Sequence, residues 1–146
     1  MGANMIIERV IVATIFAVLV PLAYAKAVDE AKICPDESSR LDPRVQSLTD
    51  ALRSAGLSNT QRAAVLLRRG NVLRERGSLR CAVADYDAAV ATDPKMVEAF
   101  IARSLVWLRQ QDLARASADI DTAIAANPKY PPAFFVQGLA WNIKGD

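Results

Sequence analysis

The sequence contains no histidine among its 146 residues. Histidine is the commonest general base near neutral pH and the commonest metal ligand, so its absence excludes Ser-His-Asp and Cys-His catalytic arrangements. The sequence also lacks a phosphate-binding loop, a dinucleotide-binding glycine pattern and a Cys-x-x-Cys pair. It therefore predicts a protein that is not an enzyme, with no cofactor, no metal and no small-molecule substrate.

An excess of charge of one sign is absent as well, because 18 basic and 16 acidic residues leave a formal net charge of +2. This balance does not favour nucleic acid as a partner. The one local excess is an arginine run between residues 62 and 80, in which Glu75 is the only acid. The run is either a patch for an acidic peptide or an anionic headgroup or, as we expect, the solvated face of helices.

Cysteine is scarce, and Cys34 and Cys81 are the only two in the chain. In an oxidising compartment such a pair indicates a disulfide, which would stabilise the fold by roughly 4 kcal/mol in the chain-entropy account. The alternative is that Cys81 is a small buried helix residue and Cys34 a free thiol. Two cysteines are too few for a structural metal site.

Long apolar runs are confined to the first 25 residues, which read MGANMIIERVIVATIFAVLVPLAYA. Arg9, the apolar run over residues 10–20 and the ending Ala23-Tyr24-Ala25 form the pattern of a secretory signal peptide. The run is short for a membrane span, which needs about 20 apolar residues. We expect cleavage after Ala25 and a periplasmic or secreted protein, the alternative being an uncleaved inner-membrane anchor. Residues 26–41 are predicted to be an acidic, mostly irregular lead-in.

What the sequence does contain is an internal repeat. Residues 82–95 read AVADYDAAVATDPK and residues 116–129 read ASADIDTAIAANPK, an offset of 34 residues. The same offset relates further sets of positions: Leu66, Phe100 and Phe134; Gly70, Ser104 and Gly138; Leu73, Trp107 and Trp141; Tyr86 and Ile120; Pro94 and Pro128. One structural unit is therefore expected to recur.

Helix signals lie at matching places in the repeat. Apolar residues at helical spacing predict a helix over 60–76, and Ser58 with Gln61 provides a capping box at its start. A second helix is predicted over 79–92, ended by Asp93-Pro94. A helix over 43–55, begun by Asp42-Pro43, stands where the second helix of an earlier repeat would lie, so we expect it to act as a cap.

At these positions the chain resembles the tetratricopeptide-repeat family, whose 34-residue helix–turn–helix unit places a large, a small and an aromatic residue, then alanine and proline, at fixed offsets. The resemblance implies an all-α fold of helical hairpins stacked in a short right-handed superhelix. Within a domain of residues 42–146 it gives the cap helix 43–55, repeats 63–96 and 97–130, and a partial repeat 131–146.

The resemblance also implies a protein or peptide partner, held without catalysis in a concave groove lined by the first helix of each hairpin. Judged by repeat position, the residues expected to line the groove are Leu67, Asn71, Arg74, Glu98, Ile101, Leu105, Leu108 and Arg109. The helix of the partial repeat 131–146 would add Phe135, Leu139 and Asn142. Some family members clamp a partner's terminal carboxylate with Lys and Asn. Here Leu67 replaces that Lys and Leu105 an Asn, so an amphipathic helix or a peptide with acidic flanks is the better fit.

Two further residue sets invite a functional reading that we do not favour. The carboxylates at 85, 87, 119 and 121 are not a catalytic pair, because i,i+2 residues of a helix point apart; we expect solvated faces. Trp107 and Trp141 occupy the aromatic repeat position, where a ring fills the core.

The last helix, in PPAFFVQGLAWNIKGD, is apolar nearly all round and lacks the second helix of its repeat. This raises a rival to groove binding, in which the protein assembles by stacking through residues 131–146, with itself or with another protein. A membrane-tethered adaptor is the third alternative, if the N-terminal segment is retained.

Overall fold

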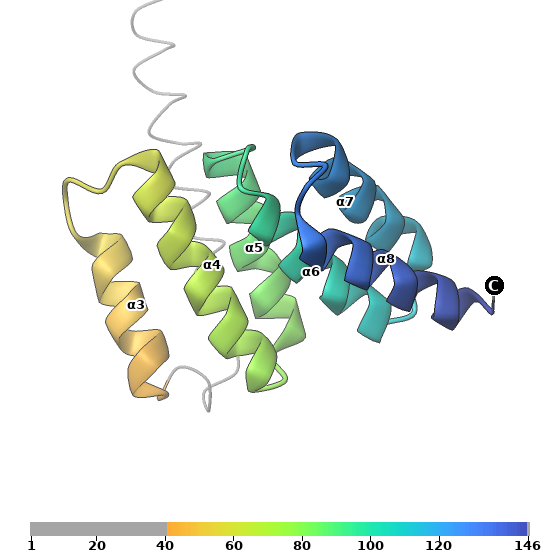
Figure 1. The fold of residues 1–146 in the computed structure, drawn as a ribbon. Helices are drawn as coiled ribbons and strands as arrows, with labels where there is room; N and C mark the ends of the chain where they lie inside the picture. Colours follow the sequence, from red (N-terminus) through yellow and green to blue (C-terminus); the bar gives the residue numbers. More distant parts are fainter. Residues whose placement is uncertain (1–40, 146) are drawn as a thin grey trace, which may run out of the picture. The chain divides into compact units, whose positions relative to one another are not determined.

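The computed structural model describes residues 41–145, and these residues form helices joined by short turns (Figure 1). The helices are α3 (Pro43–Arg53), α4 (Asn59–Glu75), α5 (Leu79–Thr92), α6 (Val97–Arg109), α7 (Leu113–Ala126) and α8 (Pro131–Lys144). The predictions for the signal peptide, the lead-in up to residue 40 and Cys34 fall outside the described residues. The proposed Cys34–Cys81 bridge therefore stays a prediction; Cys81 is buried in α5.

The helix starts follow from local chemistry. The Asp42 side chain accepts a hydrogen bond from the backbone N–H of Arg44 at 2.8 Å, and Pro43 begins α3 where no N–H is needed. At α4 the predicted capping box is present, with Ser58 and Gln61 each accepting a bond from the other's backbone N–H. The starts of α3 and α4 are thus encoded by neighbouring residues.

The helices pack as adjacent antiparallel hairpins, which confirms the all-α repeat fold. In each hairpin the first helix packs most extensively on the second: α4 on α5, and α6 on α7. First helices also contact one another, α4 with α6 and α6 with α8, while α3 packs against α4. The arrangement places α4, α6 and α8 in one layer.

The turn inside each hairpin needs one residue in the left-handed backbone region. Gly77 takes that place after α4, with φ of 82°. The residue 34 positions later is Gln111, which adopts φ of 61° despite carrying a side chain. A non-glycine residue there costs roughly 1 kcal/mol or more, so the second turn is strained where the first is not.

The core of the first hairpin is built on a close approach at Gly70. Tyr86 of α5 is fully buried, and a Cβ on Gly70 would lie 2.6 Å from its Cε1. The Tyr86 hydroxyl donates to Asn71 Oδ1 at 2.8 Å, which holds the ring in place. Absence of a side chain at residue 70 is therefore what lets α4 and α5 pack.

Buried ion pairs recur at the repeat period, and here the solvated-face prediction was wrong for two carboxylates. Asp85 and Asp119 are buried. Arg69 donates two hydrogen bonds to Asp85, from Nε to Oδ2 at 2.7 Å and from Nη2 to Oδ1 at 2.6 Å. Arg103 donates the same two bonds to Asp119, at 2.9 and 2.6 Å.

The arginine of each pair also reaches the preceding second helix. Arg69 donates to the Thr49 hydroxyl of α3 at 3.1 Å, and Arg103 donates to Asp87 of α5. Burial raises the pKa of Asp85 above its usual value, and the hydrogen bonds and charge of Arg69 oppose that rise. The spacing of acids within one helix could not predict these pairs, because each acid bonds to an arginine of another helix. The other two carboxylates of the set, Asp87 and Asp121, are exposed as expected.

Candidate partner-binding surfaces

The layer of first helices carries the residues predicted to line the groove. Glu98 and Arg109 are exposed, while Leu67, Asn71, Arg74 and Leu105 are half-buried. Leu67 and Leu105 each pack partly against the core and leave part of their surface open. This set therefore offers a partner two aliphatic contacts and a mixture of charges.

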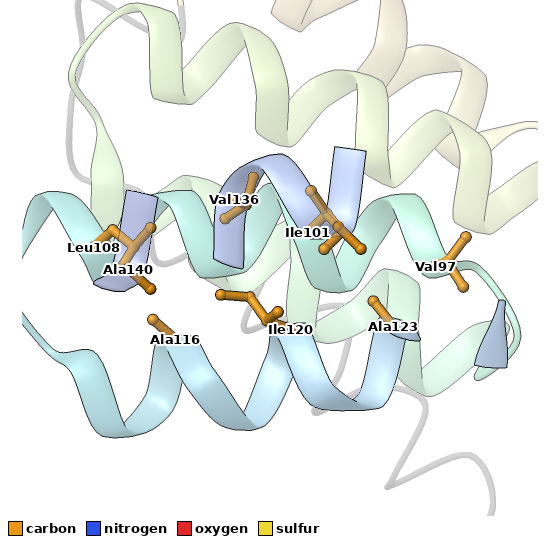
Figure 2. Packing of buried hydrophobic residues seen from close by; sticks show 9 residues of the cluster. Val97, Ile101, Leu108, Ala116, Ile120, Ala123, Val136 and Ala140 are labelled. Atoms are coloured by element: carbon orange, nitrogen blue, oxygen red, sulfur yellow. The ribbon is translucent and has the colours of Figure 1, made fainter. Parts of the chain in front are cut away.

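Two predicted groove residues belong to the core instead. Ile101 is 6% exposed and Leu108 is 5% exposed. Figure 2 shows both side chains within a cluster that also contains Val97 of α6 and residues of α7 and α8, including Ile120 and Val136. Contact between α8 and α6 covers this part of the first-helix layer. The repeat position alone could not reveal that the next helix buries it, and neither side chain is available to a partner.

Arg74 is the most distinctive polar group on this layer. Its Nε is buried and has no hydrogen-bond acceptor among the residues that the structure describes. Burial raises the pKa of Tyr86, and a hydrogen bond from the neighbouring Arg74 opposes that rise. A buried guanidinium N–H without an acceptor is costly. Arg74 as a whole is half-buried, so part of its side chain stays open to a carboxylate of a partner, which would make a charge-assisted bond.

A second concave feature, which the sequence did not predict, lies between α3 and α4. It is an open hollow of about 550 Å³. Its lining consists of Pro43, Arg44, Ser47 and Leu48 from α3 and of Arg68, Asn71 and Val72 from α4. The signal that could have found it is the predicted cap helix itself, a second helix for which no first helix was expected.

The position of α3 beside the hollow is fixed by Asp42. This buried carboxylate accepts bonds from Arg44, at the start of α3, and from Arg76 Nε at 2.8 Å, just beyond α4. Hydrogen bonds from Arg44, followed by the bond from Arg76, lower the pKa of Asp42 to about 2. The carboxylate thereby ties the start of α3 to the end of α4.

The third surface is the open side of α8. Its large apolar residues are exposed: Phe134 at 46%, Phe135 at 69%, Leu139 at 37%, Trp141 at 56% and Ile143 at 47%. At the repeat-equivalent positions in α4, Leu66 and Leu73 are buried against the core. A Cβ placed on Gly138 would meet no atom of residues 41–145 within 4 Å, in contrast to Gly70. The half-covered last helix predicted from the sequence is observed, whereas Trp141 is not the core residue that was expected.

Trp107, the preceding residue of this series, has a filled environment. Its indole N–H donates to Asp119 Oδ2 at 3.1 Å, and the Arg115 guanidinium carbon lies 3.8 Å from the ring centroid. Both contacts come from α7, the second helix of the same hairpin. Trp107 thus has the structural role predicted for it.

Within residues 41–145, no helix is long and apolar enough to cross a membrane. Among the same described residues, no group of three or more His, Cys, Asp or Glu side chains is arranged to hold a metal ion.

The tetratricopeptide-repeat family matches residues 67–131, from the middle of α4 to the start of α8. This match covers the complete hairpin α6–α7 and most of α4–α5. No curated protein matches the chain.

Proposed function

We propose that this protein is a non-catalytic protein-binding module that docks a partner segment on the layer of α4, α6 and α8, because residues 67–131 match the tetratricopeptide-repeat family. The family assignment supports protein–protein interaction in general; the surface and the chemistry of the partner are our proposal. Repeat proteins of this kind use extended surfaces made by successive units.

The observation that carries the proposed site is Arg74, whose buried Nε has no acceptor. Leu67 and Leu105 provide apolar surface on the neighbouring helices of the same layer, and Arg109 adds an exposed positive charge. The matching ligand is a peptide segment with an acidic side chain for Arg74 and apolar side chains for the two leucines.

The test is a crosslinking pull-down from the native envelope fraction, comparing the parent chain with Arg74→Ala/Leu105→Ala. A matched control, Arg80→Ala/Ile124→Ala, removes an arginine and a half-buried aliphatic residue from the second helices α5 and α7. Circular dichroism of each variant checks the fold. Capture by the parent and the control, with loss in the Arg74/Leu105 variant, supports this surface; equal capture by all three refutes it.

We also propose that the module is exported, on the basis of the signal-peptide pattern in residues 1–25. The intact mass of the native protein tests this proposal. A chain that begins at Lys26 supports cleavage and a periplasmic or secreted location, and a retained N-terminus supports the membrane-tethered alternative.

A second candidate function is assembly through α8, favoured by the five exposed apolar side chains of that helix. A contiguous exposed apolar face on a folded domain marks an interaction site more often than a free surface. The same pull-down with Trp141→Glu separates the two functions, because Trp141 is exposed on α8 and is not one of the residues proposed to hold the peptide, which are Leu67, Arg74, Leu105 and Arg109.

A further inference from the structure

The described helices leave two half-hairpins, one at each end of the stack. In the complete hairpins a first helix packs on a second helix, as α4 does on α5 and α6 on α7. Helix α8 has the repeat position of a first helix, and no second helix follows it among the described residues. Helix α3 has the position of a second helix, and no first helix precedes it there.

The two halves are complementary when residues are compared at the 34-residue offset. In the first hairpin Tyr86 of α5 packs on Gly70 of α4. The equivalent of Gly70 in α8 is Gly138, whose Cβ position no described residue approaches within 4 Å, and the equivalent of Tyr86 in α3 is Leu52. A pairing of α8 with α3 in the same register therefore brings a large side chain onto an open glycine.

The hollow between α3 and α4 lies where such a pairing needs space. In the second hairpin Trp107 lies under Arg115. The equivalent pair across the two halves is Trp141 of α8 and Ser47 of α3. Trp141 is 56% exposed, and Ser47 lines the hollow. The same register thus directs an exposed indole toward an open recess.

The other lining of the hollow comes from α4, and it is the equivalent of a surface that is covered elsewhere in the stack. Ala102 and Val106 of α6 are buried in a cluster with Val72 and Leu73 of the preceding first helix, α4. The residues of α4 at their positions are Arg68 and Val72, which line the hollow. A first helix seated there would have the same two neighbours that α4 has, a second helix and the next first helix.

The buried ion pairs give an independent sign of the same match. Each complete hairpin joins an arginine of its first helix to an aspartate of its second helix. At these positions α8 has Gln137 and α3 has Ala51. Both partners of the pair are replaced together, so at these two positions a contact between α8 and α3 leaves neither an arginine without its aspartate nor an aspartate without its arginine.

We propose that this protein associates head to tail, with α8 of one copy seated in the hollow between α3 and α4 of a second copy. This inference rests on the second proposed function, assembly through α8, and names its partner and its site. Phe134 and Trp141 are then covered by α3, while Phe135 and Leu139, the equivalents of Ile101 and Leu105, are covered by α4. The contact is heterologous, so further copies can add through the unused ends, giving an open chain or, where the rotation between copies closes, a ring.

The concentration range for testing this association is set from the size of the contact between the two copies. Helix α8 has 14 residues, which corresponds to a length of about 21 Å. One helix seated against two neighbours is a small interface of the weak, transient class, so the concentration series is centred on dissociation constants of about 10–100 µM. Association is then measurable by sedimentation velocity of the full chain over a concentration series that spans this range.

Two variants, each damaged at one end only, make the test specific. The tail variant, Phe134→Glu/Trp141→Glu, places two negative charges on α8. The head variant, Ser47→Glu/Arg68→Glu, places two negative charges in the hollow between α3 and α4. All four positions are exposed, so the fold should persist. Each variant alone should be monomeric, with its dissociation constant raised at least tenfold. A mixture of the two should form a 1:1 dimer that grows no further, because one intact head meets one intact tail. The control Ser117→Glu/Ala118→Glu, on the exposed face of α7, should associate like the parent.

The competing arrangements give different results. If the head variant still self-associates, α8 pairs with α8 of a second copy and the head-to-tail arrangement is wrong, although assembly through α8 stands. If all variants associate like the parent, the contact uses other residues. If the parent is monomeric throughout the series, no second copy fills the hollow; α8 binding to a different protein is then decided separately by the Trp141→Glu pull-down.

Discussion

The contrast between two glycines at the same repeat position provides the sharpest test of the packing. Replacing Gly70 with alanine would place a Cβ 2.6 Å from Cε1 and 2.9 Å from Cδ1 of Tyr86. The ring cannot withdraw cheaply, because Tyr86 has no exposed surface and its hydroxyl is bonded to Asn71 at 2.8 Å. At Gly138 the Cβ of an alanine would meet no atom within 4 Å in the described part of the chain.

The two substitutions are expected to change the free energy of unfolding in opposite directions. Alanine is favoured over glycine within a helix by about 0.5–1 kcal/mol, and this gain applies at both positions. Overpacking a close-packed core costs about 1–3 kcal/mol, and displacement of the ring adds about 1 kcal/mol for the lost hydrogen bond. We therefore expect Gly70→Ala to lower the free energy of unfolding by about 2 kcal/mol and Gly138→Ala to raise it by about 0.5–1 kcal/mol.

The assay is urea denaturation of the full chain in dilute solution, followed by circular dichroism at the helical band, with the parent and the two single variants measured side by side. Equal slopes would indicate that the denatured states are comparable. If Gly70→Ala were as stable as Gly138→Ala, the close approach of Tyr86 would not limit the packing of α4 on α5, and the argument would fail.

Three further changes test the electrostatics and the turn. Arg69→Met should lower the free energy of unfolding by roughly 3 kcal/mol near pH 7, because it leaves Asp85 charged and buried. This loss of stability should shrink as the pH falls, since burial already raises the pKa of Asp85. An equal loss at pH 4 and pH 7 in urea titrations would contradict this. The Asp42 pKa of about 2 lies below the unfolded value, so its contribution is present above about pH 4 and is lost as the pH falls through about 2; acid titration of Asp42→Asn should show a weaker dependence in that window. Gln111→Gly should raise the free energy of unfolding by about 1 kcal/mol by relieving the positive φ of 61°, and an unchanged urea midpoint would show that the turn is not strained.

Local signals predicted most of the helical architecture. The capping box at Ser58 and Gln61 and the Asp42-Pro43 start depend on residues within three positions of one another, so they are legible in the sequence. The prediction for the helix over 79–92 agrees with α5 at both ends. The predicted cap helix over 43–55 ends earlier, at Arg53, because the Ser54 backbone is extended.

Which side chains are buried was harder to predict from the sequence. Ile101 was predicted to face a partner, and it is buried because α8 covers that part of α6. Asp85 was predicted to be solvated, and it is buried because Arg69 reaches it from the preceding helix. In both cases the deciding neighbour belongs to a different helix, and a pattern of residue types within one helix carries no information on that neighbour.

The sequence by itself determined the repeat, its 34-residue period and the hairpin unit, since periodicity and caps are properties of residues close together in the chain. Only the tertiary structure decided which faces of those helices are covered. It exposed Trp141 while covering Trp107, the equivalent residue of the preceding repeat. It also opened the hollow between α3 and α4. The physical reason is that exposure depends on whether another helix occupies the adjoining volume, and that is settled by packing between units rather than by the residues of either unit alone.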